Sequence, residues 1–405
     1  MSDRVQQVTR RRVFYIPGYD PIPPRRYREL YRKEGAAQSD ISGYSLSLSP
    51  AQGENFGWSV EADMDGAQVQ TRFEVLVWSD IVRESMEARI LRTYAILART
   101  AWTYISTGAL FRLMKLRRGP VIAALYPIGV LLSQLLLALL VAHVTGWGAG
   151  LLHPLLYWGV GGAVLVGLLR WFKAIDGKIF AYYLMHDYGF SARWRGAEPP
   201  DLIARLDQFR AEIAAALHED WDEVLVVGHS SGAHLAVSVL ADLIRDGATS
   251  GAKPALSFLS LGQVVPMVAF LPEAKRLRRD LAYLSEREEL FWLDVTAPGD
   301  PCSFALCDPV KVSGVATEAQ RWPLVISAAF RETLSAEKQA EMKYRFFRRH
   351  FQYLCAFDDP QLYDYFQITA GPVTLRDRFA GCLPSPSRID TLANRYTDMA
   401  PEEVR

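Results

Sequence analysis

Apolar and polar positions along this chain follow two different periods, which together predict an α/β fold. Short apolar, β-branched runs that resemble buried strands lie at 12–16, 224–227, 257–261, 290–295 and 322–328. Apolar residues with helical spacing lie at 25–32, 202–218, 273–286 and 336–349. Residues 44–78 read as extended, and the Met64-Asp65-Gly66 turn between their alternating stretches predicts a β-hairpin. Strands that alternate with helices indicate an α/β fold with a mostly parallel sheet flanked by helices.

One long segment has neither period. From Gly119 to Leu169 the chain contains no Asp, Glu, Lys or Arg, whereas about 20 apolar residues are enough to cross a bilayer. The run divides near 145–148, which predicts a transmembrane helical hairpin with spans near 121–144 and 151–172. The alternative is a helical hairpin buried in the core of a soluble domain.

Basic residues flank both predicted spans. They precede the first and follow the second: Arg112, Lys115, Arg117, Arg118, then Arg170, Lys173, Lys178. The positive-inside rule then places both termini, and with them the parts of the chain before and after the hairpin, in the cytoplasm, with the tip near Trp147 on the far side. Gly159, Ala163 and Gly167 share one face of the second span and allow close helix packing. The sequence leaves open whether this face closes the hairpin or forms a homo-oligomer.

A further helix is expected directly before the spans. Its apolar positions repeat with helical spacing from Met86 to Ile105, with Arg92 and Arg99 among them. Such a helix either lies along the membrane surface or packs on the domain. The predicted organisation is therefore an N-terminal part (1–82), the helix and hairpin (83–193), a second part with strands and helices (194–385) and a helical or loose tail (386–405).

Composition narrows the function classes. Lys plus Arg and Asp plus Glu number 45 each in the 405 residues, so no overall charge favours nucleic acid as a partner. Basic residues do cluster locally, as in Arg10-Arg11-Arg12. The four cysteines lack metal-site spacing and read as reduced, structural thiols. The first residues lack an apolar run, so we expect no signal peptide.

The most informative motif is a strand followed by Gly228-His229-Ser230-Ser231-Gly232 and an apolar helical pattern. This is the arrangement of a nucleophile elbow, which presents the Ser230 hydroxyl on a strained turn. Gly228 and Gly232 are expected there because a Cβ would clash where strand and helix crowd together.

A serine nucleophile needs a base and a carboxylate that orients the base. These follow the serine in chains with such an elbow. His350 is the candidate base because it is the single histidine of seven after residue 234. Asp300 is the favoured acid, since it lies in the loop beyond the 290–295 strand, while Asp294 and Asp308 remain alternatives. His229 and His234 are expected to pack around the elbow.

An oxyanion requires two preorganised N–H donors. The backbone N–H of Ser231 is one candidate. The N–H of Tyr19, in Ile16-Pro17-Gly18-Tyr19-Asp20, is the other. A plain structural turn is the alternative for this Pro-Gly loop.

The elbow, the order Ser230, Asp300, His350 and the Pro-Gly loop resemble the α/β-hydrolase superfamily of serine esterases and lipases. The predicted hairpin is an insertion without counterpart in the basic fold, and the loop replaces the usual His-Gly loop. The resemblance implies carboxylic ester hydrolysis without a metal or organic cofactor. Proximity to a lipid bilayer favours a lipid or acyl ester over another small-molecule ester. The alternatives are a thioesterase or acyltransferase with the same triad, and a catalytically silent membrane scaffold.

Overall fold

The computed structural model describes residues 7–20, 23–51, 56–86 and 90–401. Within them, eight strands form one sheet in the order β2-β3-β4-β1-β5-β6-β7-β8. The strands from β4 onward in this order pair in parallel, whereas β2-β3 and β3-β4 are antiparallel. Their bounds are β1 Arg10–Ile16, β2 Ser45–Pro50, β3 Gly57–Met64, β4 Ala67–Val75, β5 Glu223–His229, β6 Ala255–Leu261, β7 Leu290–Thr296 and β8 Leu324–Ser327. The mostly parallel sheet is as the sequence predicts.

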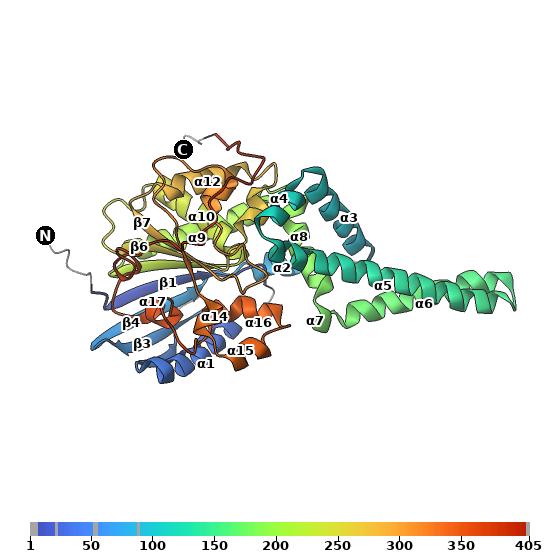
Figure 1. The fold of residues 1–405 in the computed structure, drawn as a ribbon, viewed down its shortest axis with the longest axis horizontal. Coiled ribbons are helices and arrows are strands. Elements are labelled where there is room, and N and C mark those ends of the chain that lie inside the picture. Colours follow the sequence, from blue (N-terminus) through green and yellow to red (C-terminus); the bar gives the residue numbers. More distant parts are fainter. Residues whose placement is uncertain (1–6, 21–22, 52–55, 87–89, 402–405) are drawn as a thin grey trace.

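Helices cover both faces of the sheet (Figure 1). One face carries α9 (Pro200–Leu217), α10 (Ser231–Arg245) and α12 (Lys275–Ser285), and the other carries α1 (Arg25–Ser42) and α17 (Tyr365–Ala370). Successive residues of β5 therefore enter different cores: Val224 and Val226 one, Leu225 and Val227 the other. Burial on both faces explains why such strands are continuous apolar runs.

The remaining helices are shorter or lie beside the carboxyl edge of the sheet. Their bounds are α2 Ser79–Met86, α3 Ile90–Ser106, α4 Ala109–Leu116, α7 Asp176–Ile179, α8 Ala181–Arg193, α11 Val265–Ala269, α13 Pro309–Ser313, α14 Phe330–Thr333, α15 Ala336–Glu341, α16 Phe346–His350, a 3₁₀ turn Phe351–Leu354 and α18 Leu375–Arg378. The predicted hairpin turn is present between β3 and β4, where Asp65 and Gly66 both have positive φ. Two consecutive positive φ values suit the twist of a two-residue hairpin loop.

The Arg10-Arg11-Arg12 cluster is not an exposed basic patch. Arg11 on β1 is fully buried and its Nε donates to Glu223 on β5 over 2.6 Å, while Arg12 pairs with Glu74 on β4. Glu223 also accepts from the Ser257 hydroxyl over 2.7 Å. Because an unpaired buried charge is costly, each of these charges depends on its partner in a neighbouring strand.

Two long apolar helices, α5 (Arg118–Gly150) and α6 (Pro154–Ala174), form an arm that projects from the α/β domain (Figure 1). Both are long and apolar enough to cross a membrane, and only 22% and 17% of their most apolar windows are buried. So little burial disagrees with the alternative of a hairpin inside a soluble core.

The turn of the arm lies later than predicted. The helix continues through 145–148, and the turn falls at 151–153, where the His153 side chain accepts the N–H of Leu155. Gly146 of the expected turn instead serves helix packing, since a Cβ there would lie 2.7 Å from the carbonyl oxygen of Tyr157. Gly161 makes the matching approach to Ala142 from the other helix.

The predicted small-residue face of α6 is not the face that packs on α5. Gly159, Ala163 and Gly167 are exposed, and within the described part of the chain a Cβ on either glycine would meet nothing within 4 Å. This face therefore does not close the hairpin, and a role in a homo-oligomer stays a prediction.

Three other expectations need correction. The 336–349 helix is divided into α15 and α16 by residues 342–345. The tail is neither helical nor loose up to residue 401, since Asn394 is buried and donates to the carbonyl of Ala269 over 2.9 Å. The helix expected from Met86 is α3, which begins at Ile90, while 87–89 lie outside the described residues. This helix packs on α8, where His186 meets Thr93 at 3.4 Å.

Candidate active site

Ser230 occupies a sharp turn between β5 and α10. Its φ of 57° and ψ of −120° lie in a region that L side chains rarely adopt, at a cost of about 1–3 kcal/mol that the surrounding structure must offset. The turn is fixed on one side by the Ser230 N–H, which donates to the carbonyl of Leu261 on β6 over 2.9 Å. The side chain is half-buried and lines a cavity at the carboxyl edge of the sheet.

Glycines make the turn possible because backbone segments approach each other closely there. A Cβ on Gly232 would lie 2.1 Å from the carbonyl oxygen of Ile16, and one on Gly228 would lie 2.8 Å from Cα of Ala233. A Cβ on Gly18 would lie 3.0 Å from Cβ of Ser230. The end of β1 is therefore in direct contact with the start of α10.

The structure brings His350 and Asp300 together in the same region. Nδ1 of His350 and Oδ2 of Asp300 are 2.7 Å apart, which assigns the Nδ1 proton to this hydrogen bond. Asp300 is buried and also accepts the N–H of Cys302 over 2.9 Å and the hydroxyl of Tyr353 over 3.1 Å. Burial alone would raise the pKa of Asp300, but His350 and the N–H of Cys302 outweigh burial and lower it.

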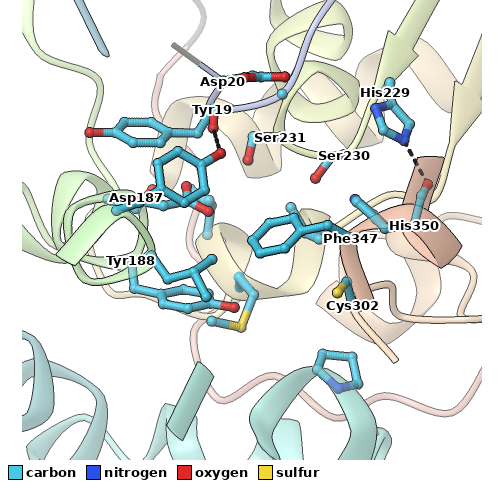
Figure 2. Close-up of a pocket in the computed structure, with 18 of the residues that line it drawn as sticks. Tyr19, Asp20, Asp187, Tyr188, His229, Ser230, Ser231, Cys302, Phe347 and His350 are labelled. Carbon is cyan, nitrogen blue, oxygen red and sulfur yellow. Dashed lines mark hydrogen bonds between the residues drawn. The ribbon is translucent and has the colours of Figure 1, made fainter. Parts of the chain in front are cut away.

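The serine and the histidine face one cavity. Figure 2 shows the Ser230 hydroxyl and the His350 ring directed into the same space, with Ser231 and Tyr19 beside them. With Nδ1 engaged by Asp300, Nε2 is the imidazole nitrogen left to exchange a proton with a group in the cavity.

The side chain of His229 contacts the backbone of His350. Nε2 of His229 lies 3.1 Å from the carbonyl oxygen of His350, and the two rings are 4.9 Å apart between centroids (Figure 2). Burial, followed by the charge of His350, lowers the pKa of His229 to about 3. Burial likewise lowers the pKa of His234 to about 4. Both rings are therefore neutral packing groups at neutral pH.

The two alternative acids have other partners. Asp294 is buried inside β7, where the Ser260 hydroxyl donates to it over 2.5 Å and burial raises its pKa to about 8. Asp308 caps α13 by accepting the N–H groups of Val310 and Lys311. Asp300 is thus the one of the three candidates that the structure places against His350.

The Ile16–Asp20 loop is held at several points. The indole N–H of Trp78 donates to the carbonyl of Pro17 over 2.9 Å, and the Tyr183 hydroxyl donates to the carbonyl of Tyr19 (Figure 2). Ser231 begins α10, and the first N–H groups of a helix have no partner within it. Tyr19 and Ser231 both line the Ser230 cavity, where their backbone N–H groups are the candidate oxyanion donors.

Sequence reasoning missed Asp187, a carboxyl that lines this cavity from α8 (Figure 2). Burial, offset in part by the charge of His350, raises its pKa to about 7. The sequence feature that could have identified it is an acidic residue within the aromatic segment 182–190. A carboxyl group among apolar residues of a helix is a candidate functional group.

Cys302 forms with Asp300 and His350 a set whose ligand atoms lie within 4.8 Å of one another. A thiol binds metal as the thiolate, whereas burial raises the pKa of Cys302 well above its ordinary value. The Nδ1 and carboxylate atoms of this set already bind each other. These residues fit an oriented acid–base pair better than a metal centre.

The assembled groups are a hydroxyl on a strained turn, an imidazole oriented by a buried carboxylate, and two backbone N–H groups beside them. Together they can carry a nucleophilic attack, a proton transfer and the stabilisation of an oxyanion. Comparison of the chain with protein-family models, curated proteins and solved structures finds no match, so its function is argued from this geometry.

Proposed function

We propose that this chain is a membrane-anchored serine hydrolase of the α/β-hydrolase type that cleaves carboxylic esters. The observation that carries the proposal is Ser230, held on a strained strand–helix turn that lines the same cavity as His350, whose Nδ1 lies 2.7 Å from Asp300. This backbone conformation costs free energy, and it presents the Ser230 hydroxyl to a cavity, which is a functional rather than a structural use.

The reaction follows from these groups. The Ser230 oxygen attacks the ester carbonyl carbon while Nε2 of His350 takes its proton, and Asp300 stabilises the resulting imidazolium. The carbonyl oxygen becomes an oxyanion that accepts hydrogen bonds from the N–H groups of Ser231 and Tyr19. The alkoxy group then leaves with the proton held by His350. Water, deprotonated by the same histidine, hydrolyses the acyl-enzyme and restores Ser230.

The arm supports a position at a membrane. Four arginines, Arg117, Arg118, Arg331 and Arg349, line a groove of about 530 Å³ at the base of α5. Together with the basic residues that flank both helices, this groove favours the cytoplasmic leaflet, whose anionic headgroups attract such clusters. We infer that the arm crosses the membrane and the catalytic domain lies in the cytoplasm.

The nucleophile is tested by labelling with a fluorophosphonate probe and by hydrolysis of a soluble 4-nitrophenyl ester. Wild type should react, and Ser230→Ala should lose both activities while its fold is retained. Ser231→Ala is the matched control, since it keeps the backbone N–H proposed as an oxyanion donor. Equal labelling of wild type and Ser230→Ala would refute the assignment.

The same measurement separates the alternatives. A catalytically silent scaffold would leave wild type unlabelled. A thioesterase or acyltransferase would label, but would turn over an acyl thioester or transfer the acyl group to an added alcohol faster than to water.

The orientation is tested by cysteines introduced at Leu152, in the turn of the arm, and at Ser2. In intact cells an impermeant thiol reagent should reach the first and not the second. Labelling at Ser2 would overturn the cytoplasmic assignment.

A further inference from the structure

A second, apolar cavity lies between α3, α4 and α5. Its volume is about 140 Å³, and its lining includes Ala101, Leu110, Leu113, Val121, Ala124 and Ile128. Among the described residues that line it, hydroxyls come from Thr100, Tyr104 and Tyr188 alone. A dry apolar cavity of roughly 150 Å³ accommodates a benzene-sized ligand, so this one has room for about six carbon atoms of a chain.

This cavity adjoins the one at Ser230. Tyr104, Tyr188 and Met267 line both. The Tyr104 hydroxyl donates to the carbonyl of Met267 over 3.0 Å, so its polar atom is already satisfied. The boundary between the two cavities therefore consists of two aromatic rings and a flexible thioether side chain, which can be displaced by an apolar chain.

The outer end of the apolar cavity reaches the surface at the base of the arm. Ile105 of α3 and Leu125 of α5 line it, yet 49% and 39% of these residues are exposed. Ile122 and Trp102 extend the exposed apolar surface around them. This surface is continuous with the arm, where the proposed membrane position would bring it against lipid.

A third cavity adjoins the Ser230 cavity and shares Tyr19, Asp187 and Ser231 with it. Its lining is mostly apolar but includes Glu198, Glu273 and Arg276, of which Arg276 and Glu198 form an ion pair. By contrast, the cavity toward α5 is lined without any charged group among the described residues. An acyl chain therefore fits better toward α5, and the more polar part of an ester fits better toward Asp187.

We propose that the cavity between α3, α4 and α5 binds the acyl chain of a membrane lipid ester, which enters sideways from the bilayer past Ile105 and Leu125. The ester carbonyl then lies at Ser230 and the alcohol part lies toward Asp187. This inference rests on the proposed hydrolase function and names its substrate class.

The test narrows the cavity without touching the Ser230 site. Ala124→Phe fills the apolar cavity, and Ala123→Phe places the same ring on the preceding residue of α5, which the described linings of the two cavities do not include. Hydrolysis of 4-nitrophenyl acetate and hexadecanoate is compared in both. Ala124→Phe should lower kcat/KM for the hexadecanoate by about 100-fold and leave acetate within about twofold, while Ala123→Phe changes neither. Unchanged hexadecanoate hydrolysis in folded Ala124→Phe would overturn the proposal.

A binding measurement keeps the inference separate from catalysis. Hexadecanoic acid with a diazirine group, added to protein in neutral phospholipid vesicles, should crosslink to peptides of α3 and α5 in wild type and in Ser230→Ala. Ala101→Phe, on the opposite wall, should reduce this crosslink as Ala124→Phe does. Crosslinking without any esterase activity would reject the hydrolase and retain the chain site. Esterase activity without crosslinking at α3 and α5 would reject the chain site alone.

Discussion

The backbone of Ser230 allows a test of the elbow that is independent of catalysis. With φ 57° and ψ −120°, the residue should carry about 1–3 kcal/mol of strain that glycine would not. Ser230→Ala keeps this strain, and Ser230→Gly releases it. Glycine loses more freedom on folding, at roughly 0.5–1 kcal/mol. We therefore expect Ser230→Gly to exceed Ser230→Ala in free energy of unfolding by about 1 kcal/mol.

Ser231 provides a control of opposite sign. It is the first residue of α10, and it is not one of the described residues that have a positive φ. Ser231→Gly should therefore be less stable than Ser231→Ala, by up to about 1 kcal/mol. The preference for glycine over alanine should reverse between two adjacent serines.

The assay is urea unfolding of detergent-solubilised protein, followed by tryptophan fluorescence and analysed at a common slope. Both Ser230 variants lack the nucleophile, so activity cannot bias the comparison. If Ser230→Ala proves as stable as Ser230→Gly while the Ser231 pair behaves as expected, the strained turn is refuted.

Other predictions concern the remaining groups of the site. His350→Ala should abolish ester turnover as fully as loss of the nucleophile, and Asp300→Asn should lower kcat by roughly 10⁴ because the imidazole tautomer is lost; near-normal turnover in either would contradict the triad. Gly232→Ala would place a Cβ 2.1 Å from the Ile16 carbonyl oxygen, so the Ile16–Asp20 loop with its candidate donor must shift and kcat should fall about 100-fold; an unchanged kcat would remove this loop from the mechanism. Burial raises the pKa of Asp187 from 3.8 to about 7, so its proton is retained in the folded chain and lost from the unfolded chain between these values. Stability should then decline as pH rises through that window, and a Tm profile of Asp187→Asn that kept the same decline would disprove the assignment.

Much of the sheet was predictable because its strands are buried on both faces. The runs at 224–227 and 257–261 are short and mostly apolar, as expected of strands buried on both faces of a sheet. Glycine or proline often bounds such runs. The elbow was predictable because its motif is contiguous in the chain, although only Gly228 is required by local contacts, with Ala233, whereas Gly232 is required by Ile16 at the end of β1. The pairing of His350 with Asp300 followed from chain order, because few residues of the required types remained.

The features that sequence could not locate depend on distant contacts. The glycines at 146 and 148 resemble a turn until Tyr157 of the other helix is seen to pack on Gly146. The tail at 389–400 has little helical pattern, yet it is held in place by hydrogen bonds: Asn394 donates to the carbonyl of Ala269, and Arg278 donates to the carbonyl of Asp398. Asp187 reaches the site because α8 packs against the loop after β1, where Tyr183 donates to the carbonyl of Tyr19. No local pattern contains this information.

The pairing of β1 with β5 has a consequence for biosynthesis. Arg11 and Glu223, which join these strands through a buried ion pair, are 212 positions apart, and the arm lies between them in the chain. During translation β1 leaves the ribosome long before β5 has been synthesised. Until then, Arg11 cannot form its ion pair with Glu223. Closing so long a loop is slow, and unpaired strand edges aggregate. In the proposed membrane position, the arm would enter the bilayer before β5 is synthesised and would tether the early strands, so that the nascent domain would mature at the bilayer surface rather than in free solution.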